Sequence, residues 1–93
     1  KYLTLSDVLD SHDNNLKFVA VVSRVKKHQT KNGDDMAFVD LEDEINTVGG
    51  VVFPKLYQRM NIVPGKVYLI FGKMDYNRNR QSIIIDDLRL IER

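Results

Sequence analysis

The sequence predicts a single all-β domain, namely a five-stranded Greek-key barrel with a helix between its third and fourth strands. Three observations lead to this fold class. Segments with apolar residues at alternate positions recur along the chain, and turn-forming residues separate them. A helical pattern interrupts the strands after Pro54. The chain has 93 residues, a length that buries roughly 65% of the unfolded chain's surface and supports one core.

Residues 1–15 are predicted to form a lead-in segment to a barrel over residues 16–92. The apolar residues of the lead-in, with Thr4 or Ser6 as an N-cap, predict a helix of one or two turns. We expect this helix to lie across one end of the barrel.

The first strand is predicted over residues 16–28, which are rich in β-branched residues. Its beginning is apolar on both faces, so we expect that part to be covered on both sides. From Arg24 onward the strand is charged and is expected to be solvated. Arg24, Lys26 and His28 either line a binding groove or protect an edge strand from aggregation.

A β-hairpin is predicted at the centre of the chain. Asn32 and Gly33 are a strong turn signal, because glycine adopts positive φ without steric cost. In the second strand, residues 35–42, two sets alternate: Ala37, Val39 and Leu41 on one side, and Met36, Phe38 and Asp40 on the other. If the aliphatic set faces the core, the Phe38 ring is exposed. The alternative is that another segment covers Phe38.

The third strand is predicted over residues 47–53, and Gly49 and Gly50 interrupt it. A bend or a bulge is the favoured explanation, ahead of the close approach of a ligand. Pro54 is expected to begin a helix that continues through Met60 and Val63, with Met60 packed in the core.

Two further strands complete the pattern, over residues 66–76 and 82–92, with a polar loop between them and an irregularity at Asp86 and Asp87. Strand, strand, strand, helix, strand, strand is the order of the oligonucleotide-binding barrel, the OB-fold. An SH3-like barrel is the competing small all-β fold, but it does not ordinarily place a helix after its third strand.

Composition narrows the functional classes. The net charge is only +1, which gives no strong long-range attraction for polyanions. Cysteine is absent, so disulfides and thiolate metal sites are excluded and an intracellular origin is favoured. No apolar run approaches the ~18 residues of a membrane span. His12 and His28 are isolated, and neither a metal site nor a cofactor is expected. Because the chain begins with Lys1, we expect it to be a fragment of a longer protein.

One set of motifs resembles a known family. It comprises Thr30-Lys31-x-Gly33-x-x-Met36-Ala37-Phe38-x-x-Leu41-Glu42-Asp43, followed by Val51-Val52-Phe53-Pro54 and Tyr57. These residues are similar to the OB-fold domain near the C-terminus of the bacterial replicative DNA polymerase III alpha subunit, and the resemblance covers residues 16–90. The shorter Phe-x-x-Leu-x-Asp core is also similar to anticodon-binding domains of class II aminoacyl-tRNA synthetases.

The resemblance implies a binding site on the second and third strands. In the wider family, the aromatic residue that matches Phe38 is exposed and stacks on a base. Gly49 and Gly50 depart from the pattern, because the family usually has a polar or acidic residue there. Lys31 in the first loop and Arg78 and Arg80 in the last loop flank this face, either as phosphate contacts or as ordinary surface charges.

Met36 and Tyr76 are candidate second contacts beside Phe38. We therefore expect weak, salt-sensitive and sequence-tolerant binding of single-stranded DNA by a monomeric domain. A polymerase context implies a cytoplasmic location, with other polymerase domains and replisome proteins as further partners.

Two alternatives from other classes remain. In the first, the domain docks a protein through Phe38, Val52 and neighbouring apolar residues. In the second, it binds an anticodon as part of a synthetase. Catalysis is not expected in this segment. Asp40 and Glu42 share a face, but no further ligand joins them to form a metal-dependent nuclease site, and a phosphate-binding glycine-rich loop is absent.

Overall fold

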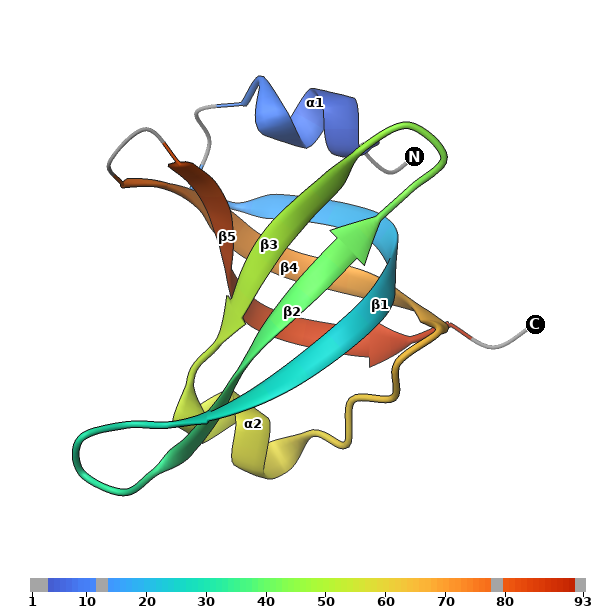
Figure 1. Cartoon of the computed structure of the whole chain (residues 1–93). Coiled ribbons are helices and arrows are strands. Elements are labelled where there is room, and N and C mark those ends of the chain that lie inside the picture. Colours follow the sequence, from blue (N-terminus) through green and yellow to red (C-terminus); the bar gives the residue numbers. More distant parts are fainter. Residues whose placement is uncertain (1–3, 12–13, 78–79, 92–93) are drawn as a thin grey trace.

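The computed structural model describes residues 4–11, 14–77 and 80–91, and it forms a closed barrel of five strands (Figure 1). The elements in chain order are α1 (Leu5–Leu9), β1 (Leu16–Gln29), β2 (Asp35–Glu42), β3 (Thr47–Val52), α2 (Pro54–Arg59), β4 (Lys66–Asn77) and β5 (Arg80–Leu90). The order around the barrel is β1-β2-β3-β5-β4, and β4 pairs back onto β1. Among the strands of the described residues, β3 and β5 are the one pair that runs parallel. The predicted fold class is confirmed.

The two helices lie at opposite ends of the barrel (Figure 1). Thr4 is the N-cap of α1, and its hydroxyl accepts a hydrogen bond from the Asp7 backbone N–H at 3.2 Å. Leu5 and Val8 of α1 are fully buried, so this helix covers the core at its end, as expected. At the other end, α2 begins at Pro54, and its Leu56 is buried.

The second helix is shorter than the sequence predicted. It ends at Arg59, with Met60 as an extended C-cap. Met60 still packs against the core, as expected. Val63 lies beyond the helix and is 38% exposed, so its assignment to the helix was wrong.

The barrel interior is filled by the inward side chains of all five strands. On β2, Ala37, Val39 and Leu41 are at most 3% exposed, which confirms the predicted alternation. Other strands supply most of the remaining core residues: Leu16, Phe18, Ala20, Val22, Val48, Val52, Tyr68, Ile70, Ile83, Ile85 and Leu88. No polar or charged residue of the described chain is buried. The closed core leaves binding to the outer surface.

A bulge in β1 changes which of its residues face outward. Val22 pairs with Leu41 and Arg24 pairs with Asp40, so Ser23 is an extra residue on the β1 side. Before the bulge the even-numbered residues of β1 point inward, whereas after it they point outward. Arg24, Lys26 and His28 therefore lie on the outer surface, and Val25 packs against the core.

A second bulge divides the β4–β5 hairpin. Phe71 pairs with Asp87 and Gly72 pairs with Ile85, which leaves Asp86 as the extra residue and confirms the irregularity predicted there. At Gly72 the two backbones approach so closely that a Cβ atom would overlap the Ile84 carbonyl oxygen. Before Gly72, β4 pairs with both β1 and β5; beyond it, β4 pairs with β5 alone.

Gly49 and Gly50 do not form the bulge that the sequence predicted. Their pairing with β2 and with β5 continues without a register shift. Gly50 faces the interior, where an added Cβ atom would lie 3.0 Å from side-chain atoms of both Val39 and Ile85. Gly49 faces outward, and nothing lies within 4 Å of the position of an added Cβ atom. Close packing explains why position 50 is a glycine, whereas at Gly49 the absence of a side chain leaves open space on the surface.

The turn between β2 and β3 is held by Asp43. Its carboxylate accepts hydrogen bonds from the backbone N–H groups of Asn46 at 2.8 Å, Ile45 at 2.9 Å and Leu5 at 3.0 Å. These bonds, above all those from Asn46 and Ile45, lower the Asp43 pKa below its usual value of 3.8, because they stabilise the charged form. The same carboxylate thus joins this turn to the first turn of α1.

The first half of β1 is not covered on both sides, contrary to expectation. Val19 and Val21 point outward and are partly exposed. Among the described residues there is no helix that is both long and apolar enough to span a membrane.

Candidate nucleic-acid interface

A continuous outer face runs over β2, β3 and β5, with the far halves of β1 and β4 as its two edges. Strand pairing places one residue from each strand in a row across this face. We call it the aromatic row, and it consists of Lys26, Phe38, Val51, Ile84 and Lys73. Phe38 is 44% exposed, Val51 and Ile84 are partly exposed, and the two lysines are exposed. An apolar strip therefore lies between two cationic edges.

A second row lies two residues further along the strands. We call it the polar row, and it consists of Arg24, Asp40, Gly49, Ser82 and Asp75. The Arg24 Nε atom lies 3.6 Å from an Asp40 carboxylate oxygen, and the side chains are 76% and 42% exposed, respectively. This pair contributes little to stability, because solvent screens it. Its effect on the face is to neutralise one of the two carboxylates.

Some residues of both rows line a groove with a volume of about 450 Å³. Phe38, Asp40 and Val51 form its side nearer to β2, and Asp75, Gln81 and Ser82 form its side on the β4–β5 hairpin. Gly49 and Gly50 lie between them. The absence of a side chain at Gly49 keeps the middle of this groove open.

Phe38 has an aromatic neighbour on β1. The His28 ring lies 5.4 Å from the Phe38 ring, centroid to centroid, and the two planes are tilted by 56°. Both side chains are exposed, so each restricts the other while leaving ring surface open to solvent. The exposure of Phe38 was predicted, and the structure confirms it.

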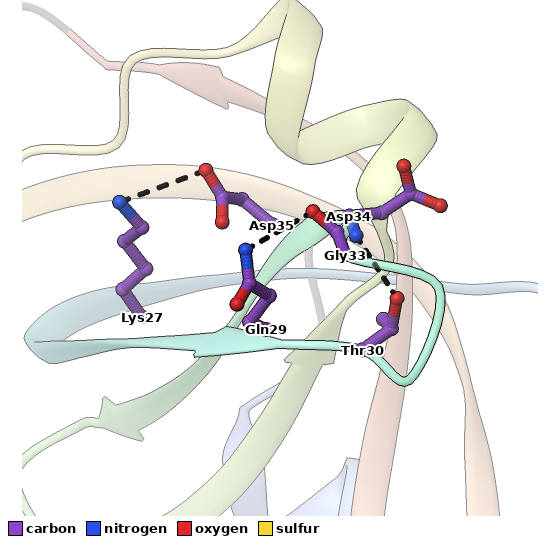
Figure 2. Close-up of polar contacts among 6 residues, drawn as sticks. All are labelled: Lys27, Gln29, Thr30, Gly33, Asp34 and Asp35. Carbon is purple, nitrogen blue, oxygen red and sulfur yellow. Dashed lines mark hydrogen bonds and ion pairs between the residues drawn. The ribbon is translucent and has the colours of Figure 1, made fainter.

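The β1–β2 turn projects beyond the end of the barrel that carries α2 (Figure 1). Gly33 has a φ of 87°, a conformation that favours glycine. The Thr30 hydroxyl accepts from the Asp34 backbone N–H at 3.1 Å, and the Gln29 side-chain amide donates to the Gly33 carbonyl at 3.1 Å (Figure 2). An ion pair of 3.6 Å between Lys27 and Asp35 ties the strands at the base of the turn (Figure 2). Lys31 is exposed on this ordered turn.

Four other residues that the sequence predicted as contacts are not placed on this face by the described structure. Arg78 and the side chain of Arg80 lie outside the described residues. Tyr76 is 52% exposed, but its hydroxyl donates to the Ser11 carbonyl at 3.0 Å, which directs it toward the lead-in segment. Tyr76 also lies on the opposite side of β4 from Lys73 and Asp75, so the structure does not place it in the aromatic row. Met36 is only 7% exposed, so its expected surface position was wrong.

One residue that we assigned to a protein-docking surface, Val52, does not lie on the surface. Val52 is fully buried inside the barrel and cannot contribute to a surface patch. Sequence reasoning also missed Lys73, Val51 and Ile84. The signal for Lys73 was present in the alternation of β4, but its neighbours across the sheet depend on the parallel pairing of β3 with β5.

Comparisons with known proteins show the family and the fold of the chain. Residues 17–91 match the model of a family described as "OB-fold nucleic acid binding domain". The chain belongs to this family. The OB domain is also similar to DNA polymerase III subunit alpha of Staphylococcus aureus (strain MSSA476), with 31% identity over 98% of the chain. The corresponding protein of Borreliella burgdorferi is 33% identical over 96% of the chain. The OB domain spans only 9% and 8% of these two relatives.

Solved structures with the same fold include a chain of "a Replication Protein A Heterotrimer Bound to ssDNA". The TM-score is 0.72 with 19% identity, over 89% of the OB domain and 62% of that chain. The second OB-fold domain of replication protein A from Methanococcus maripaludis gives a TM-score of 0.61 with 16% identity, over 88% of the OB domain and 87% of that chain. At these identities the likeness concerns the fold alone.

Proposed function

We propose that this OB domain binds single-stranded DNA on the face of the aromatic row. The observation that carries the proposal is the position of Phe38 in an apolar strip, directly beside Lys26 at one edge, with Lys73 at the opposite edge. A single strand has both of the chemical features that this row matches, namely unpaired bases with open faces and a chain of phosphates.

In this proposal the stacking of a base on Phe38 is the main attractive contact. Removing one such aromatic platform typically weakens binding by about 1–3 kcal/mol per base. Because every base has a π-face, stacking tolerates sequence. A duplex would bind more weakly, because its bases are already stacked on one another.

Phosphates would contact the cationic edges. Lys26 and Lys73 flank the strip directly, and Lys31 extends from the β1–β2 turn. Arg80 is the first residue of β5, and Arg78 precedes it by two positions in the sequence. The carboxylate of Asp75 on the same face opposes this attraction, whereas that of Asp40 is paired with Arg24. We therefore expect a dissociation constant in the micromolar range or weaker at physiological salt.

The context that we propose is a replicative polymerase of the DNA polymerase III alpha type, in which the domain holds template strand without catalysing a step. Similarity to this subunit in two organisms supports the polymerase over the synthetase alternative. The parent enzyme would then act in the bacterial cytoplasm, beside other polymerase domains and replisome proteins, and the isolated domain would be a monomer.

Fluorescence anisotropy tests the proposal. A labelled oligo-dT and a duplex of equal length are titrated with the domain at low salt, and with the variants Phe38→Ala and Ile45→Ala. Ile45 is 82% exposed on the β2–β3 turn, away from the aromatic row, and is the matched control.

We expect the wild-type domain and Ile45→Ala to prefer the single strand, and Phe38→Ala to lose at least about fivefold in affinity. Absence of binding at millimolar protein would refute autonomous DNA binding. Equal binding by Phe38→Ala and wild type would place the site elsewhere on the domain.

A further inference from the structure

The polar row next to Phe38 presents acceptors where a stacked base would point its edge. Residues two apart along a strand are separated by about 7 Å, which is close to the width of a nucleobase. A base that stacks on Phe38 can therefore reach Asp40 of the polar row. Asp75 lies three strands away from Phe38, across β3 and β5, so the base that can reach it is the next one along the DNA, which lies over Gly49, where no side chain intervenes.

The polar row contains two carboxylates, Asp40 and Asp75, and they differ in whether another residue already occupies them. Asp40 is engaged by Arg24 at 3.6 Å. For Asp75, no hydrogen bond or ion pair is found with any part of the described chain. Ser82 pairs directly with Asp75 across β4 and β5, and both side chains line the groove. Asp75 is thus the acceptor that remains open to a ligand.

We propose that Asp75 makes the groove prefer bases that carry an exocyclic amino group, and guanine most of all, over thymine. This inference rests on the proposed function. It narrows that function at the one position beside Phe38 and leaves the other bases of the strand without discrimination.

The reason is the chemistry of the base edges. An ionised carboxylate only accepts hydrogen bonds. Guanine presents its N1–H and its N2 amino group side by side, so it can donate to both oxygens of one carboxylate. Cytosine and adenine each present one amino group. Thymine has carbonyl oxygens on either side of its single N–H, and these oxygens are repelled by a carboxylate.

The test compares hexanucleotides that differ only in their two central bases: thymine, guanine, or hypoxanthine in the form of deoxyinosine. Deoxyinosine keeps the guanine ring and its stacking surface but lacks the N2 amino group. Titrations are performed with the wild-type domain, with Asp75→Asn and with Asp86→Asn. Asp86 is exposed at the bulge of β5 and lines a different surface depression, next to Asn15 and Lys17, so Asp86→Asn is the matched control for loss of one negative charge.

We expect the wild-type domain and Asp86→Asn to bind the guanine hexanucleotide at least about fivefold more tightly than the deoxyinosine and thymine ones. In Asp75→Asn this ratio falls toward one. The ratio is the decisive quantity, because removal of any negative charge raises the affinity for every oligonucleotide.

Three results would overturn the inference. Equal binding of the three hexanucleotides by the wild-type domain would refute the preference and leave single-strand binding intact. A preference that persists in Asp75→Asn would assign it to another residue. Failure of all three to bind would refute the proposed function, and the preference with it.

Discussion

The rings of His28 and Phe38 lie 5.4 Å apart on neighbouring strands, with their planes tilted by 56°. Such a tilted pair is worth about 0.5–1.5 kcal/mol, and here it restricts the rotamers of the ring that we assign to base stacking. We expect His28→Ala to weaken binding of oligo-dT by about two- to fivefold, a smaller effect than that of Phe38→Ala.

A double-mutant cycle checks whether His28 acts through Phe38. The His28→Ala effect on oligo-dT affinity should nearly vanish in a Phe38→Ala background, because there is no longer a ring to position. The same loss in both backgrounds would mean that His28 contacts the DNA independently.

The cationic edges predict how binding depends on salt. Each phosphate contact on a single strand contributes about 0.7 to the slope of log affinity against log salt concentration. Lys26→Ala and Lys73→Ala should each reduce the magnitude of that slope by about 0.7. Lys66→Ala, at the opposite end of β4 from Lys73, should leave it unchanged. An unaltered slope in the Lys26→Ala and Lys73→Ala variants would show that these two lysines do not contact phosphates.

The two adjacent glycines of β3 predict opposite outcomes. Gly49→Val places its side chain in open space, so we expect a folded domain with little change in thermal stability. Because the valine side chain fills the middle of the groove, the affinity of the Gly49→Val variant for oligo-dT should fall severalfold. Gly50→Val forces a branched side chain between Val39 and Ile85 and should destabilise the fold by about 1–3 kcal/mol. Thermal unfolding and anisotropy of both variants measure the difference, and loss of folding in Gly49→Val would contradict the assignment.

Asp43 predicts a dependence of stability on pH. Its pKa in the folded protein is lowered below 3.8, so the charged form stabilises the fold at higher pH and this contribution is lost as the pH falls through the folded-state pKa. Asp43→Asn should reduce the free energy of unfolding by about 1 kcal/mol near neutral pH. Well below pH 3.8 the difference between wild type and variant should shrink. Urea unfolding at both pH values tests this, and a difference that is independent of pH would exclude the carboxylate charge as its cause.

Local patterns predicted much of this fold. The bounds of β2 follow from the alternation between Met36 and Leu41, and the start of α2 follows from Pro54. The same alternation correctly predicted an exposed Phe38. It failed for Met36, because alternation tells which side of a strand a residue takes and not how other segments cover that side.

The rest depended on contacts that a linear pattern does not contain. No glycine in the sequence predicts the bulge at Ser23, yet this bulge places Arg24, Lys26 and His28 on the same face as Phe38. The parallel pairing of β3 with β5 joins residues more than thirty positions apart, such as Gly49 and Ser82. Without that pairing, neither Lys73 nor Asp75 could be assigned to the groove.

The bulge at Asp86 and the close approach at Gly72 divide the β4–β5 hairpin into two parts with separate tasks. The part on the barrel side of the bulge closes the cylinder through the pairing of β4 with β1, whereas in the part beyond it β5 pairs with β3 and the outward side chains form one side of the groove. Ile83 of the outer part is fully buried in the core, but the outward-facing Asp75 and Ser82 can be exchanged while the barrel keeps its shape. The same barrel can therefore carry different side chains on the hairpin side of the groove. Gly72 would have to be kept in each case, because the β4 and β5 backbones approach closely there.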